Sequence, residues 1–396
     1  MHLYPSLPLA VCAFAALLLI YTYIGYPLLL RLLARVRTLP VPSDVPDDEL
    51  PRVSISVPAY NEGAQIRELL ESLLALDYPR DRLQILVVSD CSSDETDDVV
   101  REYRDRGIEL LRLEERGGKT KAENAAARHL TGDIIVNTDA SIRIDPGALK
   151  RLVAAFSDPD IGLASGRDRS VSNVDAPGNA GEAGYVGYEM NVRALETRVG
   201  GIIGASGCFY AIRADLHRLP LPDELSRDFA AALHTREHGY RAVSVSEAAC
   251  NVPRTPSLRR EYRRKVRTIT RGMETLWHKR ALLNPFRFGG FSWMLLSHKI
   301  FRWALPWAAL ATFVSLGTLS PRYAGAAVLF GVGVIFLVLG GAGWLLADRA
   351  DVPAPLRIPA YILAGNVAAA HAFLRVVRGD RDALWEPTRR GPVASG

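Results

Sequence analysis

Long uncharged runs of apolar residues mark both ends of the chain. The first covers residues 7–30 and holds 24 residues without a charge. At about 1.5 Å per residue in a helix, this run is long enough to cross a hydrocarbon core of about 30 Å. Because no basic residue precedes it and it is longer than the apolar part of a signal peptide, we expect a retained transmembrane helix.

Three further uncharged runs lie near the C-terminus, over residues 303–319, 324–347 and 358–374. Their lengths are 17, 24 and 17 residues, so the middle run predicts a membrane span most strongly. The sequence therefore predicts a chain with several transmembrane helices, grouped at its two ends.

Basic residues beside these runs predict the orientation. No Lys or Arg precedes the first run, and Arg31, Arg35 and Arg37 follow it, so the positive-inside rule places the N-terminus outside and the next domain in the cytoplasm. Three more crossings would leave the C-terminus outside, whereas the five arginines in its last 22 residues favour the inside. We therefore expect one run to fall short of a full span, and the short run at 358–374, which contains two polar residues, is the first candidate.

Between the two ends, apolar runs of strand length alternate with helical patterns. The predicted strands cover residues 53–57, 83–89, 108–113 and 133–138, and the predicted helices lie near 64–76, 96–106, 119–130 and 146–156. This alternation is typical of a parallel sheet covered by helices, and right-handed crossovers place the four strands in one sheet. The predicted fold class is therefore α/β.

The residues just after the predicted strands form one group of candidates, because ligands bind at this edge in sheets of this kind. They are Pro58, Ala59, Tyr60, Asn61 and Glu62 after the first strand, Asp90 after the second, Gly117, Gly118 and Lys119 after the third, and Asp139 after the fourth. An aromatic ring that stacks on a base, carboxylates that accept from ribose hydroxyls and a lysine that meets a phosphate would together form a nucleotide site. Each also has a structural alternative, because Asn61 can cap the next helix, Asp90 can stabilise a turn and Lys119 can be solvated.

The charge and composition of the chain favour a lipid membrane over nucleic acid as its partner. The formal net charge is +5, and the basic residues cluster near the membrane segments, which fits an anionic lipid leaflet and argues against nucleic acid. The four cysteines, Cys12, Cys91, Cys208 and Cys250, show no metal-binding spacing and are expected to be reduced thiols. No G-x-G-x-x-G motif follows the first strand, which argues against a dehydrogenase.

Several motifs together resemble the membrane-anchored family 2 inverting glycosyltransferases. They are "SISVPAYNEGAQ" from residue 54, "VVSDCSSDET" from 87, "GGKTKAENAA" from 117, "TDAS" from 138, "GASGCFYAIR" from 204 and "SRDFAAALHTREHG" from 226. The resemblance implies the GT-A fold, with a Rossmann-like, mostly parallel sheet and flanking transmembrane helices. It also implies transfer of a sugar from a nucleotide diphosphate sugar, with a UDP-sugar expected and Mg²⁺ or Mn²⁺ as cofactor, to a lipid-linked or glycan acceptor at the inner (plasma) membrane.

The resemblance also implies a domain plan. An N-terminal anchor (1–38) and a Pro- and Asp-rich linker (39–51) precede a cytoplasmic glycosyltransferase domain (52–256), which is followed by amphipathic, interfacial helices (257–302), C-terminal transmembrane helices (303–376) and a basic tail (377–396).

The same resemblance assigns roles to single residues. Pro58, Ala59, Tyr60 and Glu62 fall in the nucleoside-contacting loop, and Asp90 matches the base-contacting aspartate. Lys119 matches the lysine near the diphosphate, and Asp139 matches the first carboxylate of the metal-binding Asp-x-Asp motif. Asp228 matches the general base. The structural alternative for Asp228 is an N-cap or first-turn acid of the helix that begins there.

Two residues depart from the family pattern. Ser141 stands in place of the second Asp of the metal motif, and Arg227 in place of the Glu before the base. Because a hard divalent cation prefers anionic oxygen, the loss of one carboxylate should weaken metal binding.

A third comparison with the family concerns processivity. Processive synthases carry Gln-x-x-Arg-Trp on an amphipathic helix, and this chain matches it loosely with Arg264, Arg267 and Thr268. Arg267 is a candidate phosphate contact, and the alternative is a basic helix that lies on the anionic leaflet. A processive polysaccharide synthase and a non-catalytic nucleotide-binding membrane scaffold remain as alternative functions.

Overall fold

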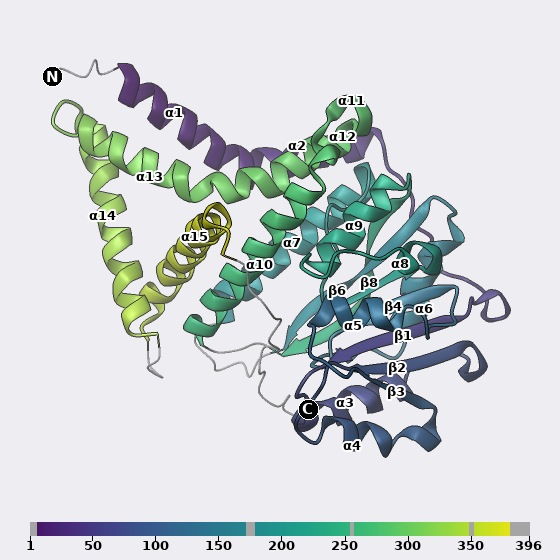
Figure 1. The fold of residues 1–396 in the computed structure, drawn as a ribbon. Helices are drawn as coiled ribbons and strands as arrows, with labels where there is room; N and C mark the ends of the chain where they lie inside the picture. The colour runs from purple at the N-terminus through teal and green to yellow at the C-terminus, as the bar shows by residue number, and fades with distance from the viewer. Residues whose placement is uncertain (1–5, 172–178, 254–256, 348–351, 381–396) are drawn as a thin grey trace.

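The computed structural model of the chain describes residues 6–171, 179–253, 257–347 and 352–380. Its centre is one mixed sheet of eight strands in the order β3-β2-β1-β4-β7-β6-β8-β5 (Figure 1). The strands are β1 (Val53–Ala59), β2 (Leu83–Ser89), β3 (Ile108–Arg112), β4 (Ile134–Thr138), β5 (Arg143–Ile144), β6 (Ile161–Val171), β7 (Phe209–Arg213) and β8 (Arg241–Pro253).

The first half of the sheet is the parallel half that the sequence predicts. Strands β1 to β4 pair in parallel, with Val53 opposite Leu83 on one side and Ile134 on the other. All seven residues of β1 are buried, as expected for a strand covered on both faces. The second half is not parallel throughout, because β7 runs antiparallel to both β4 and β6.

Helices cover both faces of the sheet. They are α3 (Gly63–Leu74), α4 (Thr96–Arg101), α5 (Lys119–Ala126), α6 (Ala148–Ala154), α7 (Asn179–Val199), α8 (Ala214–Arg218) and α9 (Arg227–Glu237). One core cluster joins Val57 of β1 to Leu70 of α3, and the other joins Val88 of β2 to Ala122 of α5 and Ala231 of α9. Successive strand residues point to opposite faces, so β4 contributes Val136 to the first cluster and Ile135 to the second.

The α/β prediction and the four predicted strands are confirmed, whereas three predicted helices are longer than the real ones. The helix predicted near 96–106 ends at Arg101 and continues as a short 3-10 turn up to Gly107, whose φ of 86° stops it. The helices predicted near 119–130 and 146–156 end at Ala126 and Ala154.

In the part of the chain that the structure describes, four helices are long and apolar enough to cross a membrane, namely 6–36, 290–319, 324–345 and 355–378. The first contains α1 (Ser6–Ile20), a π-helical turn (Tyr21–Gly25) and α2 (Tyr26–Val36); the second contains α12 (Gly290–Leu295), a π-helical turn (Leu296–Ile300) and α13 (Phe301–Leu319). The others are α14 (Ala324–Leu345) and α15 (Ala354–Arg378). The four uncharged runs therefore form helices, and a partial span at 358–374 stays a prediction.

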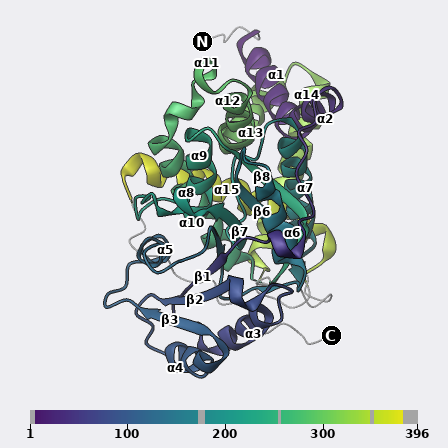
Figure 2. The same cartoon turned by 90° about the vertical axis from the view of Figure 1, so that its right-hand side faces the viewer.

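These helices lie together on one side of the sheet domain (Figure 1). In the view turned by 90°, β3 lies at the opposite end of the molecule from α1 (Figure 2). A basic helix, α10 (Leu258–His278), lies between the sheet and α15 (Figure 1), and the hydroxyl of Tyr262 on α10 lies 2.9 Å from Nδ1 of His371 on α15. Short helical segments, Arg280–Leu283 and α11 (Pro285–Phe288), follow α10. Residues 381–396 of the predicted basic tail lie outside the described part of the chain.

Candidate active site

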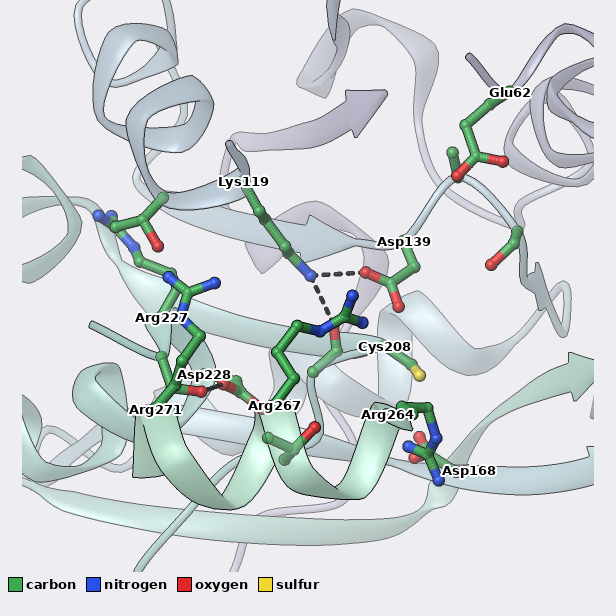
Figure 3. A pocket seen from close by; sticks show the side chains of 16 residues that line it. Glu62, Lys119, Asp139, Asp168, Cys208, Arg227, Asp228, Arg264, Arg267 and Arg271 are labelled. Carbon is green, nitrogen blue, oxygen red and sulfur yellow. Dashed lines mark hydrogen bonds and ion pairs between the residues drawn. The ribbon is translucent and has the colours of Figure 1, made fainter. Parts of the chain in front are cut away.

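A cavity of about 230 Å³ opens at the carboxyl end of β4, between the sheet and α10. Its charged lining residues are Glu62, Lys119, Asp139, Asp168, Arg227, Asp228, Arg264, Arg267 and Arg271 (Figure 3). Ser141 also lines the cavity. The structure thus brings together six of the positions that the sequence singles out, from five separate segments of the chain. They are Glu62, Lys119, Asp139, Ser141, Asp228 and Arg267.

Lys119 and Asp139 form an ion pair inside this cavity. Asp139 follows the last residue of β4, and Lys119 is the first residue of α5. The Lys119 Nζ donates to Asp139 Oδ1 at 2.6 Å and to the carbonyl oxygen of Gly207 at 2.8 Å (Figure 3). Burial lowers the pKa of Lys119, but Asp139 and Glu123 more than offset this and raise it overall. The cavity therefore keeps a positive charge that can meet a phosphate.

Asp228 reaches the cavity from the first turn of α9. Ser226 is the N-cap residue, and its hydroxyl donates to Asp228 Oδ1 at 2.7 Å. A Cβ at Gly207 would lie 2.9 Å from Asp228 Oδ2, so a side chain there would displace the carboxylate. Asp228 is a first-turn acid of α9, as the structural alternative predicts. The same residue also lines the cavity, so the two interpretations are compatible.

Glu123, which the sequence analysis did not select, lies next to these residues. It is fully buried on α5, and its Oε2 lies 3.2 Å from the Nε of Arg227. Its Oε1 lies 4.0 Å from the Nζ of Lys119. Burial raises the pKa of Glu123, although Lys119 and Arg227 act in the opposite direction. The spacing of four residues from Lys119 on a helix was the available signal in the sequence.

Arginines on α10 form one wall of the cavity. Arg264, Arg267 and Arg271 have the spacing of a single helix face and line the cavity together (Figure 3). Arg264 pairs with Glu261 at 2.7 Å, and Arg271 donates to the carbonyl oxygen of Leu225 at 2.8 Å. Because α10 also contacts α15, a phosphate role for Arg267 and a position of α10 beside the membrane are compatible.

Asp90 is held by backbone groups outside this cavity. Its Oδ1 and Oδ2 accept from the amides of Gly117 and Gly118, both at 2.7 Å, and the residue is 1% exposed. Gly118 has a φ of 84°, so glycine is favoured there. In the structure, Asp90 therefore shapes the loop that leads into α5.

The other residues predicted for the nucleoside site also lie at the ends of β1 and β2. Pro58 and Ala59 are buried in β1, and the Arg116 guanidinium lies 3.8 Å from the centre of the Tyr60 ring. These residues and Asp90 are not among those that line the described cavity. The idea that Asn61 caps α3 is wrong, because Asn61 Oδ1 accepts from the amide of Ser93 at 2.8 Å.

Asp168 is an acid in the cavity wall that the sequence did not reveal. It lies on β6, where Oδ1 accepts from the Ser206 hydroxyl at 2.6 Å and from the Cys250 thiol at 3.7 Å. Burial raises the pKa of the Cys250 thiol well above its usual value. All four cysteines lie in the described part of the chain, and none of them forms a disulfide.

The residues present do not form a complete metal site. Among the described residues, no group of three or more His, Cys, Asp or Glu side chains is placed to hold an ion. Asp139 offers one carboxylate, which already pairs with Lys119, and Ser141 offers a hydroxyl. Since Mg²⁺ and Mn²⁺ prefer several oxygen ligands, the protein alone supplies too few.

Comparison with known proteins finds a family model that matches part of the chain. The model for glycosyl transferase family 2 matches residues 54–218. The probable glycosyltransferase YdaM of Bacillus subtilis is 35% identical over 130 residues, which are 31% of each chain. The poly-beta-1,6-N-acetyl-D-glucosamine synthase of Staphylococcus aureus is 24% identical over 239 residues, or 59% of this chain and 57% of the synthase. Each match covers less than two thirds of the relative's length.

A solved structure supports the same fold. The mannosyltransferase PcManGT from Pyrobaculum calidifontis, solved with GDP-Man and Mn²⁺, aligns with a TM-score of 0.72 over 94% of this chain and 100% of that one, at 23% identity. The sheet, the cavity at the strand ends and the matched motifs agree with this likeness. The chain therefore has a GT-A fold, and its residues 54–218 match the model for glycosyl transferase family 2.

Proposed function

We propose that this chain is a membrane-bound inverting glycosyltransferase that moves a sugar from a nucleotide diphosphate sugar to a lipid-linked or glycan acceptor. The observation that carries the proposal is the meeting of Asp228, Asp139 and Lys119 in one cavity. A single in-line displacement needs a proton acceptor, which Asp228 would supply, and a positive charge near the leaving diphosphate, which Lys119 would supply. Asp139 adds a carboxylate for a cation that accompanies the donor.

In this reaction an acceptor oxygen attacks the anomeric carbon while the bond from that carbon to the phosphate oxygen breaks. Asp228 takes the acceptor proton, and the nucleoside diphosphate leaves with the bonding electrons. A well-placed general base contributes about 10² to 10⁴-fold. Lys119 and Arg267 offset the negative charge that develops on the leaving diphosphate.

The donor is a nucleotide diphosphate sugar. The resemblance favours a UDP-sugar, whereas the mannosyltransferase from Pyrobaculum calidifontis was solved with GDP-Man and Mn²⁺, so both nucleotides belong in a test. A divalent cation, Mg²⁺ or Mn²⁺, would enter with the diphosphate and use the Asp139 carboxylate. The donor's phosphate oxygens would supply ligands that the protein lacks.

The four apolar helices found among the described residues support membrane attachment. Arg31, Arg35 and Arg37 follow the first of them, so we propose that the catalytic domain faces the cytoplasm from the inner membrane. An acceptor that is itself held in the membrane would reach the cavity beside α10. A processive synthase is the second candidate, favoured by the likeness to a poly-beta-1,6-N-acetyl-D-glucosamine synthase.

A donor screen tests the proposal. Purified membranes that contain the protein should release nucleoside diphosphate from one member of a panel of UDP- and GDP-sugars. The matched control is Asp228→Asn, which should lose at least about 10² in rate because the base is absent, while donor affinity stays nearly intact. A variant that keeps more than a tenth of the rate would show that Asp228 is not the base. Nucleotide binding without turnover of any donor would favour the non-catalytic scaffold.

A further inference from the structure

An arginine lies directly beside the proposed base. Arg227 precedes Asp228 at the start of α9, and both side chains line the same cavity. A guanidinium that paired with Asp228 would stabilise the ionised carboxylate and weaken it as a proton acceptor. The position of the Arg227 side chain therefore matters for the reaction.

The structure holds Arg227 in a different direction. Its side chain is 3% exposed, and its Nε lies 3.2 Å from Glu123 Oε2. Its NH1 donates to Asn124 Oδ1, and its NH2 donates to the carbonyl oxygen of His217 at 3.4 Å. Each of these partners belongs to α5 or α8, so packing between helices fixes the guanidinium.

Glu123 joins Arg227 to the ion pair at the tip of β4. The carboxylate lies between the Arg227 guanidinium and the Lys119 amine, which donates to Asp139. The four charges thus alternate in sign from α9 through α5 to the strand end. Glu123 is fully buried, and a buried charge without a partner is strongly unfavourable, so the arrangement is tightly constrained.

We propose that Glu123 is a positioning residue, which holds Arg227 away from Asp228 and directs Lys119 toward Asp139. In this way α5 supplies a carboxylate that balances the arginine beside the base. The inference depends on the proposed function in one respect, because it takes Asp228 as the base. Other ionisable groups that face Asp228 or line the same cavity are Glu62, Lys119, Asp139, Asp168, Cys208, Tyr210, Arg264, Arg267 and Arg271.

Glu123→Gln tests the proposal. The neutral amide removes the ion pair, and only Asn124 and the His217 carbonyl oxygen then hold the guanidinium. We expect these two contacts to be too weak to keep Arg227 away from Asp228. An opposite charge within about 4–6 Å lowers a carboxyl pKa by about 1–3 units. We therefore expect the acidic limb of the kcat profile to move to lower pH by at least about one unit and kcat to fall by about tenfold or more. Glu237→Gln, which breaks a 2.5 Å pair with Lys279 at the other end of α9, is the matched control and should leave the profile in place.

The double variant Glu123→Gln, Arg227→Met separates positioning from stability. It removes the competing cation, so activity and the acidic limb should return to within about threefold and a few tenths of a pH unit of wild type. If Glu123→Gln does not fold, the double variants Glu123→Gln, Arg227→Met and Glu123→Gln, Arg227→Lys are compared instead. Only the variant with lysine should show the loss and the shift.

The outcomes are distinct from those of the proposed function. An active Asp228→Asn enzyme would refute the proposed base and with it this inference. An inactive Asp228→Asn enzyme combined with a wild-type profile for Glu123→Gln would overturn this inference alone. Equal activity of the double variants with methionine and lysine would also overturn it.

Discussion

The ends of two strands in the same sheet use an aspartate in different ways. At the end of β2, Asp90 is 1% exposed, and both of its oxygens accept from backbone amides. At the end of β4, the Asp139 side chain is 20% exposed and pairs with the amine of Lys119 within the cavity. Sequence position alone makes the two residues look equivalent, because each follows a buried strand.

This difference indicates that the Asp90 carboxylate stabilises the loop beside the site, whereas the Asp139 carboxylate is available to a ligand. Asp90 fixes the Gly117–Gly118 turn from which α5 starts, and so it places Lys119. Asp139 meets Lys119 where a donor phosphate would arrive. A carboxylate satisfied by two amides stabilises the fold, whereas one paired with a lysine in a cavity can exchange its partner for a ligand.

Asp139→Asn should give the largest loss of turnover among these variants. If turnover does not fall, the contrast between Asp139 and Asp90 is wrong. We expect turnover to fall by about 10² or more, because the anionic contact in the cavity is lost. The melting temperature should change little, since the Asn oxygen and the Gly207 carbonyl still accept from Lys119 and Glu123 remains as a counter-charge. Activity assays and thermal unfolding measure the two effects. An active variant would return Asp139 to the role of an ordinary turn residue at the end of a strand.

Asp90→Asn should show the opposite balance. The amide has one acceptor oxygen in place of two, so the unfolding free energy should fall by about 2 kcal/mol. Donor affinity should fall with it, because the turn that places Lys119 loosens. Denaturant unfolding and donor binding report the two quantities. Lost donor binding at unchanged stability would instead show that Asp90 contacts the base, as the family resemblance implies.

Metal binding sharpens the account of Asp139. One carboxylate that already pairs with Lys119 should bind Mg²⁺ or Mn²⁺ weakly, with a dissociation constant of about a millimolar or above. Nucleoside diphosphate should tighten binding, because its oxygens complete the ligand set. Calorimetry with and without the nucleotide measures this dependence. Tight binding of metal by the protein without nucleotide would contradict the description of the site.

Thiol labelling should show the smallest effect, and it tests whether the domain that contains Asp90 and Asp139 faces the cytoplasm. An impermeant reagent added to intact cells should leave Cys91, Cys208 and Cys250 unlabelled. Cys208 and Cys250 are buried in any case, whereas Cys91 is partly exposed next to Asp90, so Cys91 is the informative position. Permeabilised cells, in which Cys91 should react, are the control. Labelling of Cys91 from outside would reverse the orientation.

The sequence by itself determined the elements whose signals are local. The strands β1 to β4 follow from short apolar runs, and their ends locate Asp90, Lys119 and Asp139 without any knowledge of distant parts of the chain. The four apolar helices follow from the length of uncharged runs, for the same reason. The motifs around these ends were also sufficient to indicate the family.

Only the tertiary structure decided which distant residues meet. The antiparallel placement of β7 between β4 and β6, which brings Asp168 on β6 into the cavity wall, depends on strand pairing across long loops. The pair of Glu123 with Arg227 depends on the packing of α5 against the start of α9. Hydrophobic periodicity indicates which face of an element is buried but not which other element covers it, so contacts of this kind arise only when the whole domain packs.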